Sequence, residues 1–190
     1  CEVSPEEEKL LESPAKPLVL LKRREGKQGT PVKQVSEHVA PNNKYLGFML
    51  PYTPLHYLLF NTPPHDTPVL VMTSGNISDE PICYSNEEAF KRLKNIADYF
   101  LVHNRDIHTR CDDSVVRIFP VAHRPALVIR RSRGYVPSPI KLDFSFNRQV
   151  LACGAELKST FCMAKNEFAF VSHHIGDLEN AGTLAAFEEG

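Results

Sequence analysis

The feature that most constrains the fold is a short apolar segment that runs directly into a polar loop containing glycine. Residues 68–73 read Pro-Val-Leu-Val-Met-Thr, and residues 74–81 read Ser-Gly-Asn-Ile-Ser-Asp-Glu-Pro. A short apolar, β-branched run between Pro and Gly is typical of a buried strand. In open α/β sheets, ligands bind beyond the carboxyl ends of strands. The pattern therefore predicts a sheet with a polar, ligand-facing loop at one strand end.

Predicted strands and helices alternate along the first three quarters of the chain. Helix starts are indicated where Ser or Thr precedes Pro or acidic residues, which cap and charge a helix N-terminus favourably. This alternation predicts an α/β (α+β) fold with a twisted open sheet and flanking helices. The predicted strands are 17–21, 46–50, 68–73, 99–103, 115–119 and 126–131, and the predicted helices are 4–12, 54–60 and 86–97.

A second domain is predicted to begin near residue 145. Prolines at 137 and 139 make residues 136–149 resemble an interdomain linker. Short strands are expected after it, at 150–155, 160–164 and 168–172. We therefore predict one domain at 1–145 and the start of another at 146–190. The composition of both ends also predicts that the 190 residues are a piece of a longer polypeptide.

Composition narrows the class of protein. The formal net charge is -1, so overall charge does not favour a nucleic-acid partner. The five cysteines form no CxxC pair and are widely spaced, which indicates reduced thiols. No apolar run approaches the roughly 20 residues that span a bilayer. These observations predict a soluble, cytoplasmic protein without a membrane partner.

The loop after residue 72 carries the first candidate site residues, Thr73, Ser74 and Asn76. Short hydroxyls, an amide and the neighbouring Gly75 suit contacts with phosphate or ribose, because the backbone can approach a ligand closely there. The alternative is a polar turn in which the Ser and Asn side chains satisfy the loop's own backbone.

The segment 103–118 carries a second set of candidates. Arg105 and Arg110 could bind an anion, since guanidinium groups recognise phosphate and carboxylate with two parallel hydrogen bonds. The alternative is a solvated ion-pair loop in which Asp112 and Asp113 neutralise the two arginines.

Histidines offer little support for a metal site. His103 and His108 are five residues apart, a separation that matches no common ligand spacing. The adjacent His173 and His174 are equally open to a metal-binding or a structural role. We therefore predict no metal site in this chain.

Three arginines cluster at residues 130–133. Strand alternation would send Arg130 and Arg131 to opposite faces, so at most one of that pair faces a given cleft. Such a stretch could bind phosphate, contact nucleic acid or simply form a solvated strand edge.

Longer motifs in fixed order resemble a known family. Residues 73–81 are similar to the T-S-[AG]-N-x-S-x-x-P loop of YrdC-like domains. Residues 46–59, 103–117 and 130–137 resemble the version of that domain found in HypF-type carbamoyltransferases. Residues 151–180 resemble the start of the next domain of that family, which has an actin/Hsp70-like nucleotide-binding fold.

The resemblance implies a two-step reaction. The YrdC-like domain would form carbamoyl-adenylate from carbamoyl phosphate and ATP with Mg²⁺, and the following domain would pass carbamoyl to the C-terminal cysteine of the partner HypE. Zinc is implied only for parts of the family that this sequence lacks, and the piece alone is expected to be inactive. The alternatives are a threonylcarbamoyl-adenylate synthase for tRNA modification and a non-catalytic RNA-binding module, although nucleic acid is not the expected partner.

Matching positions carry the family's substrate and nucleotide roles onto this sequence. The resemblance gives Ser74 and Asn76 as a nucleotide-binding pair and Ser114 as a residue bordering the acyl-adenylate. It gives Arg130 or Arg131 as a phosphate ligand, and Thr73, Arg105 and Arg110 complete the candidate set. The family's upstream lysine–x–arginine strand is absent here, and no catalytic residue is assigned. We expect Ser74, Asn76, Ser114 and an arginine of the 130–131 pair to share one pocket.

Overall fold

A computed structural model of the protein describes residues 1–24, 35–61, 69–78, 80–119, 126–179 and 181–189. The chain divides into two compact units. Unit 1 contains Cys1–Met72 and Asp113–Arg130, and unit 2 contains Thr73–Asp112 and Arg131–Gly190. Each unit is described by itself.

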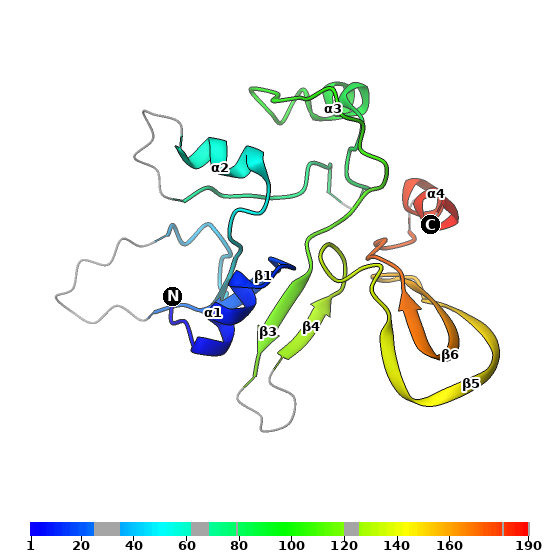
Figure 1. The fold of residues 1–190 in the computed structure, drawn as a ribbon. Coiled ribbons are helices and arrows are strands. Elements are labelled where there is room, and N and C mark those ends of the chain that lie inside the picture. Colours follow the sequence, from blue (N-terminus) through cyan, green and yellow to red (C-terminus); the bar gives the residue numbers. More distant parts are fainter. Residues whose placement is uncertain (25–34, 62–68, 79, 120–125, 180, 190) are drawn as a thin grey trace. The chain divides into compact units, whose positions relative to one another are not determined.

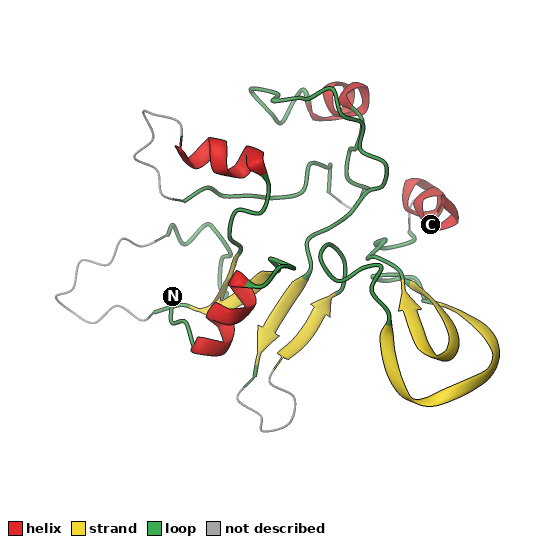
Figure 2. Ribbon diagram, in the orientation of Figure 1, coloured by secondary structure: helices red, strands yellow, loops and turns green. Residues whose placement is uncertain are grey.

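Unit 1 is built on a four-stranded mixed sheet (Figures 1 and 2). The central pair, β1 and β3, is parallel, and each of these strands pairs antiparallel with an edge strand. The strands in spatial order are β2 (Tyr45–Phe48), β1 (Leu18–Lys22), β3 (Val115–Ile118) and β4 (Ala126–Arg130).

The core of unit 1 lies on one face of this sheet. Val19 of β1 pairs beside Val116 of β3, and neither side chain is exposed to solvent. Leu21 points to the same face, two residues along β1, because side chains alternate along a strand. Leu11 of α1 (Pro5–Glu12) covers this face and forms a buried cluster with Val19 and Leu21.

The N-terminus of α1 is stabilised by its own side chains. The backbone N–H of Ser4 donates to Glu7 Oε2 (2.8 Å), and the backbone N–H of Glu7 donates to Ser4 Oγ (3.3 Å). This capping box satisfies two N–H groups that a helix end leaves without partners. The helix predicted from the Ser-Pro-Glu sequence is therefore confirmed.

A second helix, α2 (Pro54–Asn61), also lies in unit 1 and starts as its sequence predicts. Thr53 Oγ1 accepts a hydrogen bond from the backbone N–H of His56 (3.2 Å). Pro54 occupies the first helical position, where a missing N–H costs nothing.

Unit 2 contains a long antiparallel hairpin and two helices (Figure 2). The hairpin consists of β5 (Ile140–Cys153) and β6 (Phe161–Val171), and its register shifts twice along β5. The helix α3 (Asn86–Leu93) begins at Ser85, whose Oγ accepts from the backbone N–H of Glu88 (3.1 Å). The helix α4 (Ala181–Glu189) follows the hairpin.

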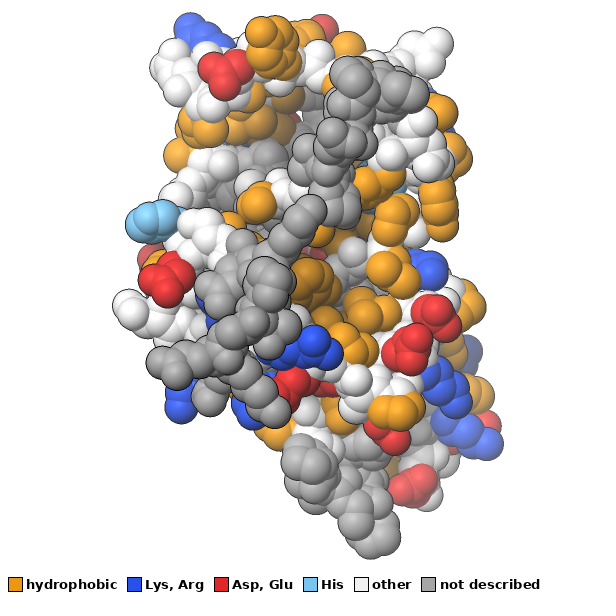
Figure 3. Space-filling model, turned by 90° about the vertical axis from the view of Figure 1, so that its left-hand side faces the viewer, with side chains coloured by type: hydrophobic (Ala, Val, Ile, Leu, Met, Phe, Trp, Pro, Cys, Tyr) orange, Lys and Arg blue, Asp and Glu red, His pale blue; other side chains and the backbone are white. Residues whose placement is uncertain are grey.

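Two strand predictions are wrong. Of the strand predicted at 68–73, residue 68 lies outside the described residues, and residues 69–73 belong to no strand. Residues 99–103 belong to no strand either. Apolar side chains of both segments are exposed, Val71 by 73% and Tyr99 by 92%, and exposed hydrophobic side chains are visible on the face drawn in Figure 3. Hydrophobic composition gives a segment its preference for a strand, but the strand forms only where another strand accepts its hydrogen bonds.

The segment predicted as an interdomain linker, 136–149, is a strand from Ile140 onward, where β5 begins. The short strands expected after residue 149 are parts of β5 and β6 instead. Alternating polar residues such as Lys141 and Asp143 conceal this strand, because both of its faces are largely exposed. The domain boundary near residue 145 stays a prediction.

The fold class itself is confirmed. A mixed sheet with flanking helices is the α/β arrangement that the alternation of elements predicts. Among the residues that the structure describes, no helix is long and apolar enough to cross a membrane.

Shortening a buried side chain of the central strand pair should destabilise unit 1. We expect Val116→Ala to lower the free energy of unfolding by about 1–3 kcal/mol, because it removes buried methyl groups and leaves a cavity. Val3→Ala is the matched control, since Val3 is half exposed and should change stability little. Chemical denaturation measures both variants. Equal unfolding free energies for the two variants would contradict this placement of the core.

Candidate functional site

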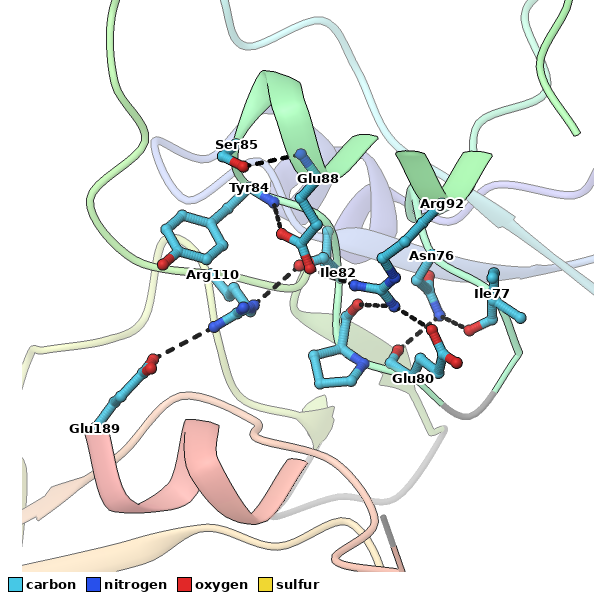
Figure 4. Close-up of polar contacts among 11 residues, drawn as sticks. Asn76, Ile77, Glu80, Ile82, Tyr84, Ser85, Glu88, Arg92, Arg110 and Glu189 are labelled. Carbon is cyan, nitrogen blue, oxygen red and sulfur yellow. Dashed lines mark hydrogen bonds and ion pairs between the residues drawn. The ribbon is translucent and has the colours of Figure 1, made fainter. Parts of the chain in front are cut away.

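The loop that follows residue 73 is closed by its own polar side chains. Ser74 Oγ donates to Asn76 Oδ1 (2.5 Å), and Asn76 Nδ2 donates to the carbonyls of Ile77 and Glu80 (both 3.0 Å; Figure 4). The backbone N–H of Cys83 closes the loop by donating to the Gly75 carbonyl (2.9 Å).

This pattern bears on both interpretations of the loop. Asn76 uses its amide on the loop backbone, as the polar-turn alternative expects. Thr73 and Ser74 are nevertheless exposed at its start. A ligand could therefore reach these two residues, and nucleotide binding here stays a prediction.

One arginine of α3 joins this loop to the helix. Arg92 forms ion pairs with Glu80 in the loop and with Glu88 one helical turn earlier, and it donates to the Pro81 carbonyl (3.2 Å; Figure 4). Burial lowers the pKa of Arg92, but hydrogen bonds to the two carboxylates outweigh this effect and raise the pKa overall. Sequence reasoning missed Arg92. The Glu88–Arg92 spacing of four residues on a helix was the available signal.

Arg110 holds the far end of the same loop. Its Nε donates to the Ile82 carbonyl (3.0 Å), and its guanidinium lies 4.2 Å from the centre of the Tyr84 ring. Its acidic partner is Glu189 of α4 (3.3 Å; Figure 4). The ion pair of Arg110 described here is thus with Glu189, whereas the alternative considered above paired the arginines of this segment with Asp112 and Asp113.

Asp112 instead contacts a histidine of the pair whose role the sequence left open. Asp112 Oδ2 lies 2.9 Å from His174 Nδ1, and both side chains are largely buried. Burial lowers the pKa of the neighbouring His173, Asp112 partly opposes this effect, and His174 adds to it. Among the described residues, no three His, Cys, Asp or Glu side chains are grouped to hold a metal ion.

Arg131 binds backbone carbonyls of unit 2. Its guanidinium donates to the carbonyls of Val171 (3.3 Å), Tyr135 (2.9 Å) and Ser138 (2.6 Å). Burial lowers the pKa of Arg131 and raises that of Tyr135, because both charged forms are desolvated. Arg131 thus fastens the turn after β4 to the end of β6.

The remaining candidates have different surroundings. Ser114 is fully buried, and its carbonyl accepts from the Leu18 backbone N–H (2.8 Å) where β3 begins beside β1. Arg130 Nε donates to the Asp113 carbonyl (2.8 Å). Arg105 is exposed.

The candidate residues are thus divided between the two units. Ser114 and Arg130 belong to unit 1, and the other candidates belong to unit 2. Within unit 2, Asn76 and Arg110 both donate hydrogen bonds to carbonyls of the Ser74 loop, and Figure 4 shows part of this network. The single pocket expected from the sequence stays a prediction.

Comparisons with known proteins identify the class of protein. The model of the Sua5/YciO/YrdC family, described as "Telomere recombination", matches residues 1–132. The model of the HypF Kae1-like domain matches residues 145–190. The first part of the chain is therefore a YrdC-like domain.

Curated relatives narrow this class. The chain is 47% identical to the carbamoyltransferase HypF of Synechocystis sp. over 96% of its own length, and 41% identical to a probable carbamoyltransferase HypF of Methanocaldococcus jannaschii over 97%. The chain covers 22% of each of these two relatives.

Solved structures agree with the sequence relatives. A full-length HypF crystallised in a phosphate- and nucleotide-bound form matches the whole chain with a TM-score of 0.83 and 49% identity, and HypF from T. kodakarensis matches it with a TM-score of 0.86 and 43% identity. The chain covers 28% and 23% of these two proteins. The chain belongs to the HypF family of carbamoyltransferases and spans about a quarter of the length of the relatives it matches.

Lowering the pH should reduce the free energy of unfolding through the protonation of His173. Its pKa lies below the ordinary 6.5 in the folded chain, so the unfolded chain binds more protons between about pH 7 and 5. The histidine therefore contributes stability above pH 6.5 that is lost as the pH falls. We expect His173→Gln to flatten the fall in unfolding free energy over this range, whereas His38→Gln, at an exposed position, should not. Parallel pH profiles for the wild type and His173→Gln would contradict the assignment.

Proposed function

We propose that this chain is part of an ATP-dependent carbamoyltransferase. The protein makes carbamoyl-adenylate from carbamoyl phosphate and ATP and then transfers the carbamoyl group to the C-terminal cysteine of HypE during NiFe-hydrogenase maturation. The observation that carries the proposal is the order of the two family matches, with a YrdC-like domain followed directly by a HypF Kae1-like segment. Relatives named carbamoyltransferase HypF support it.

ATP enters as a substrate together with Mg²⁺. Formation of an adenylate releases pyrophosphate, so negative charge on the transferring phosphoryl group must be stabilised by fixed donors and cations. We assign the nucleotide to Thr73, Ser74 and Asn76, whose loop presents hydroxyl and backbone groups. The nucleotide-bound form of a similar HypF supports nucleotide binding in this family.

The candidate residues outside that loop differ in the contacts they already make and in their exposure to a phosphate. Arg130 and Ser114, in unit 1, keep the roles that the family resemblance gives them. Exposed Arg105 is accessible to an anion. Arg131 donates to three backbone carbonyls, so a phosphate would have to compete with these bonds.

We place the protein in the cytoplasm. All five cysteines are unpaired, as expected of thiols in a reducing compartment. The proposed acceptor of the carbamoyl group is itself a cysteine thiol, and such a thiol must be reduced in order to react.

The second candidate is a threonylcarbamoyl-adenylate synthase, because the family model of residues 1–132 also embraces the Sua5 and YrdC proteins. The HypF Kae1-like match at residues 145–190 favours the carbamoyltransferase. An RNA-binding module finds less support in a net charge of -1.

The decisive experiment is pyrophosphate exchange by the full-length protein with ATP, Mg²⁺ and carbamoyl phosphate. We expect exchange that depends on carbamoyl phosphate and is not replaced by threonine with bicarbonate. Exchange supported by threonine and bicarbonate would favour the synthase. Folded protein without exchange under either condition would contradict the proposed function.

Within this assay, Ser74→Ala should reduce exchange by about tenfold or more, because it removes an exposed hydroxyl that the proposal assigns to the nucleotide and that also bonds Asn76 Oδ1. Asn76→Ala should reduce it as well, since the amide also closes the loop. Ser145→Ala and Asn95→Ala are matched controls at exposed positions outside the loop. Normal exchange rates in both Ser74→Ala and Asn76→Ala would show that the nucleotide binds elsewhere.

A further inference from the structure

Two consecutive carbonyls at the end of the Ser74 loop are each bound by an arginine. Arg92 of α3 donates to the Pro81 carbonyl (3.2 Å), and Arg110 donates through Nε to the Ile82 carbonyl (3.0 Å; Figure 4). Both arginines belong to the same unit as the loop. When a guanidinium group donates its hydrogen bonds to main-chain carbonyls, it holds the backbone in place.

The contacts of Arg92 lead back to Asn76. Glu80, which forms an ion pair with Arg92, also accepts a hydrogen bond at its carbonyl from Asn76 Nδ2 (3.0 Å). The same residue is therefore held from one side by the proposed nucleotide loop and from the other by α3. Arg92 is partly buried, with 21% of its side chain exposed, whereas Glu80 is 43% exposed, so solvent screens this ion pair in part.

Glu88 connects the two arginines. It forms the second ion pair of Arg92, and its Oε2 accepts from the backbone N–H of Tyr84 (3.2 Å). The Tyr84 ring is the surface against which Arg110 stacks, at 4.2 Å. Because the backbone N–H of Glu88 is bound by the Ser85 cap, the start of α3 anchors this whole arrangement.

We propose that Arg92 and Arg110 are positioning residues that hold the described parts of the Ser74 loop, residues 74–78 and 80–83, in their nucleotide-binding conformation. This inference rests on the proposed function, in which Ser74 and Asn76 bind ATP. It assigns to Arg110 a role through the protein backbone in place of direct phosphate contact. Neither arginine touches the reacting atoms, so removing either one should weaken ATP binding more than it slows the chemical step.

The test is pyrophosphate exchange by the full-length protein with ATP as the varied substrate. We expect Arg92→Gln to raise KM for ATP about tenfold with a smaller change in kcat, because a misplaced loop loses ground-state binding. Arg110→Gln should act in the same direction. Arg92→Lys should recover part of the affinity, since it keeps the charge but cannot bridge two carboxylates and a carbonyl.

Lys91→Gln is the matched control, because Lys91 is an exposed cation at the neighbouring position of α3. A double variant with Ser74→Ala separates positioning from a general loss of stability. If Arg92 acts through the loop, Arg92→Gln should raise KM much less when Ser74 is already alanine. An unchanged KM in Arg92→Gln, or full additivity with Ser74→Ala, would overturn the inference.

Amide hydrogen exchange decides the positioning role independently of catalysis. The backbone N–H of Cys83, bound to the Gly75 carbonyl, should exchange faster in Arg92→Gln than in the wild type or in Lys91→Gln. Unchanged protection of this amide would overturn the inference even if KM rose. If the wild-type protein shows no pyrophosphate exchange, the proposed function fails, while this measurement still decides whether Arg92 holds the loop.

Discussion

Parallel pairing of β1 with β3 is the constraint on which unit 1 depends. It places Val19 beside Val116, two residues from distant parts of the sequence, and it buries both completely. Once this pair forms, α1 can cover it through Leu11. The pairing also fixes Ser114 at the start of β3, because the Ser114 carbonyl accepts from Leu18. A buried strand pair thus determines where one candidate site residue lies.

Unit 2 relies more on polar contacts than on a core. No side chain of α3 is fully buried, and residues 73–75, 77 and 78 of the Ser74 loop are exposed. Without apolar burial, a loop keeps one conformation only if its backbone groups have partners. Asn76 provides such partners from within the loop, and Arg92 and Arg110 provide them from outside. The order of the proposed nucleotide loop therefore comes from hydrogen bonds and charge.

The features predicted correctly from the sequence are those that depend on residues close together in the chain. Short-range rules predicted the Ser4 and Ser85 caps and the Pro54 helix start, and the structure confirms them. They also predicted a strand at 17–21, which the structure has at Leu18–Lys22. The strand expected at 68–73 does not form over its described residues, 69–73, because strand formation depends on a partner elsewhere in the chain. The Arg110–Glu189 and Asp112–His174 pairs could not be foreseen for the same reason, since no spacing rule links residues so far apart. The self-closing bonds of Ser74 and Asn76 were foreseen as one alternative.

The adjacent arginines at 130 and 131 show what the alternation of side chains along a strand can and cannot predict. It predicted that they point apart without saying which one could reach a ligand. Arg131 donates to three carbonyls at the end of β6 and in the turn after β4, and burial lowers its pKa. A phosphate at Arg131 would have to displace these bonds and release the turn. Arg130 also donates to a backbone carbonyl, that of Asp113, so the choice between the two arginines as the phosphate ligand stays a prediction.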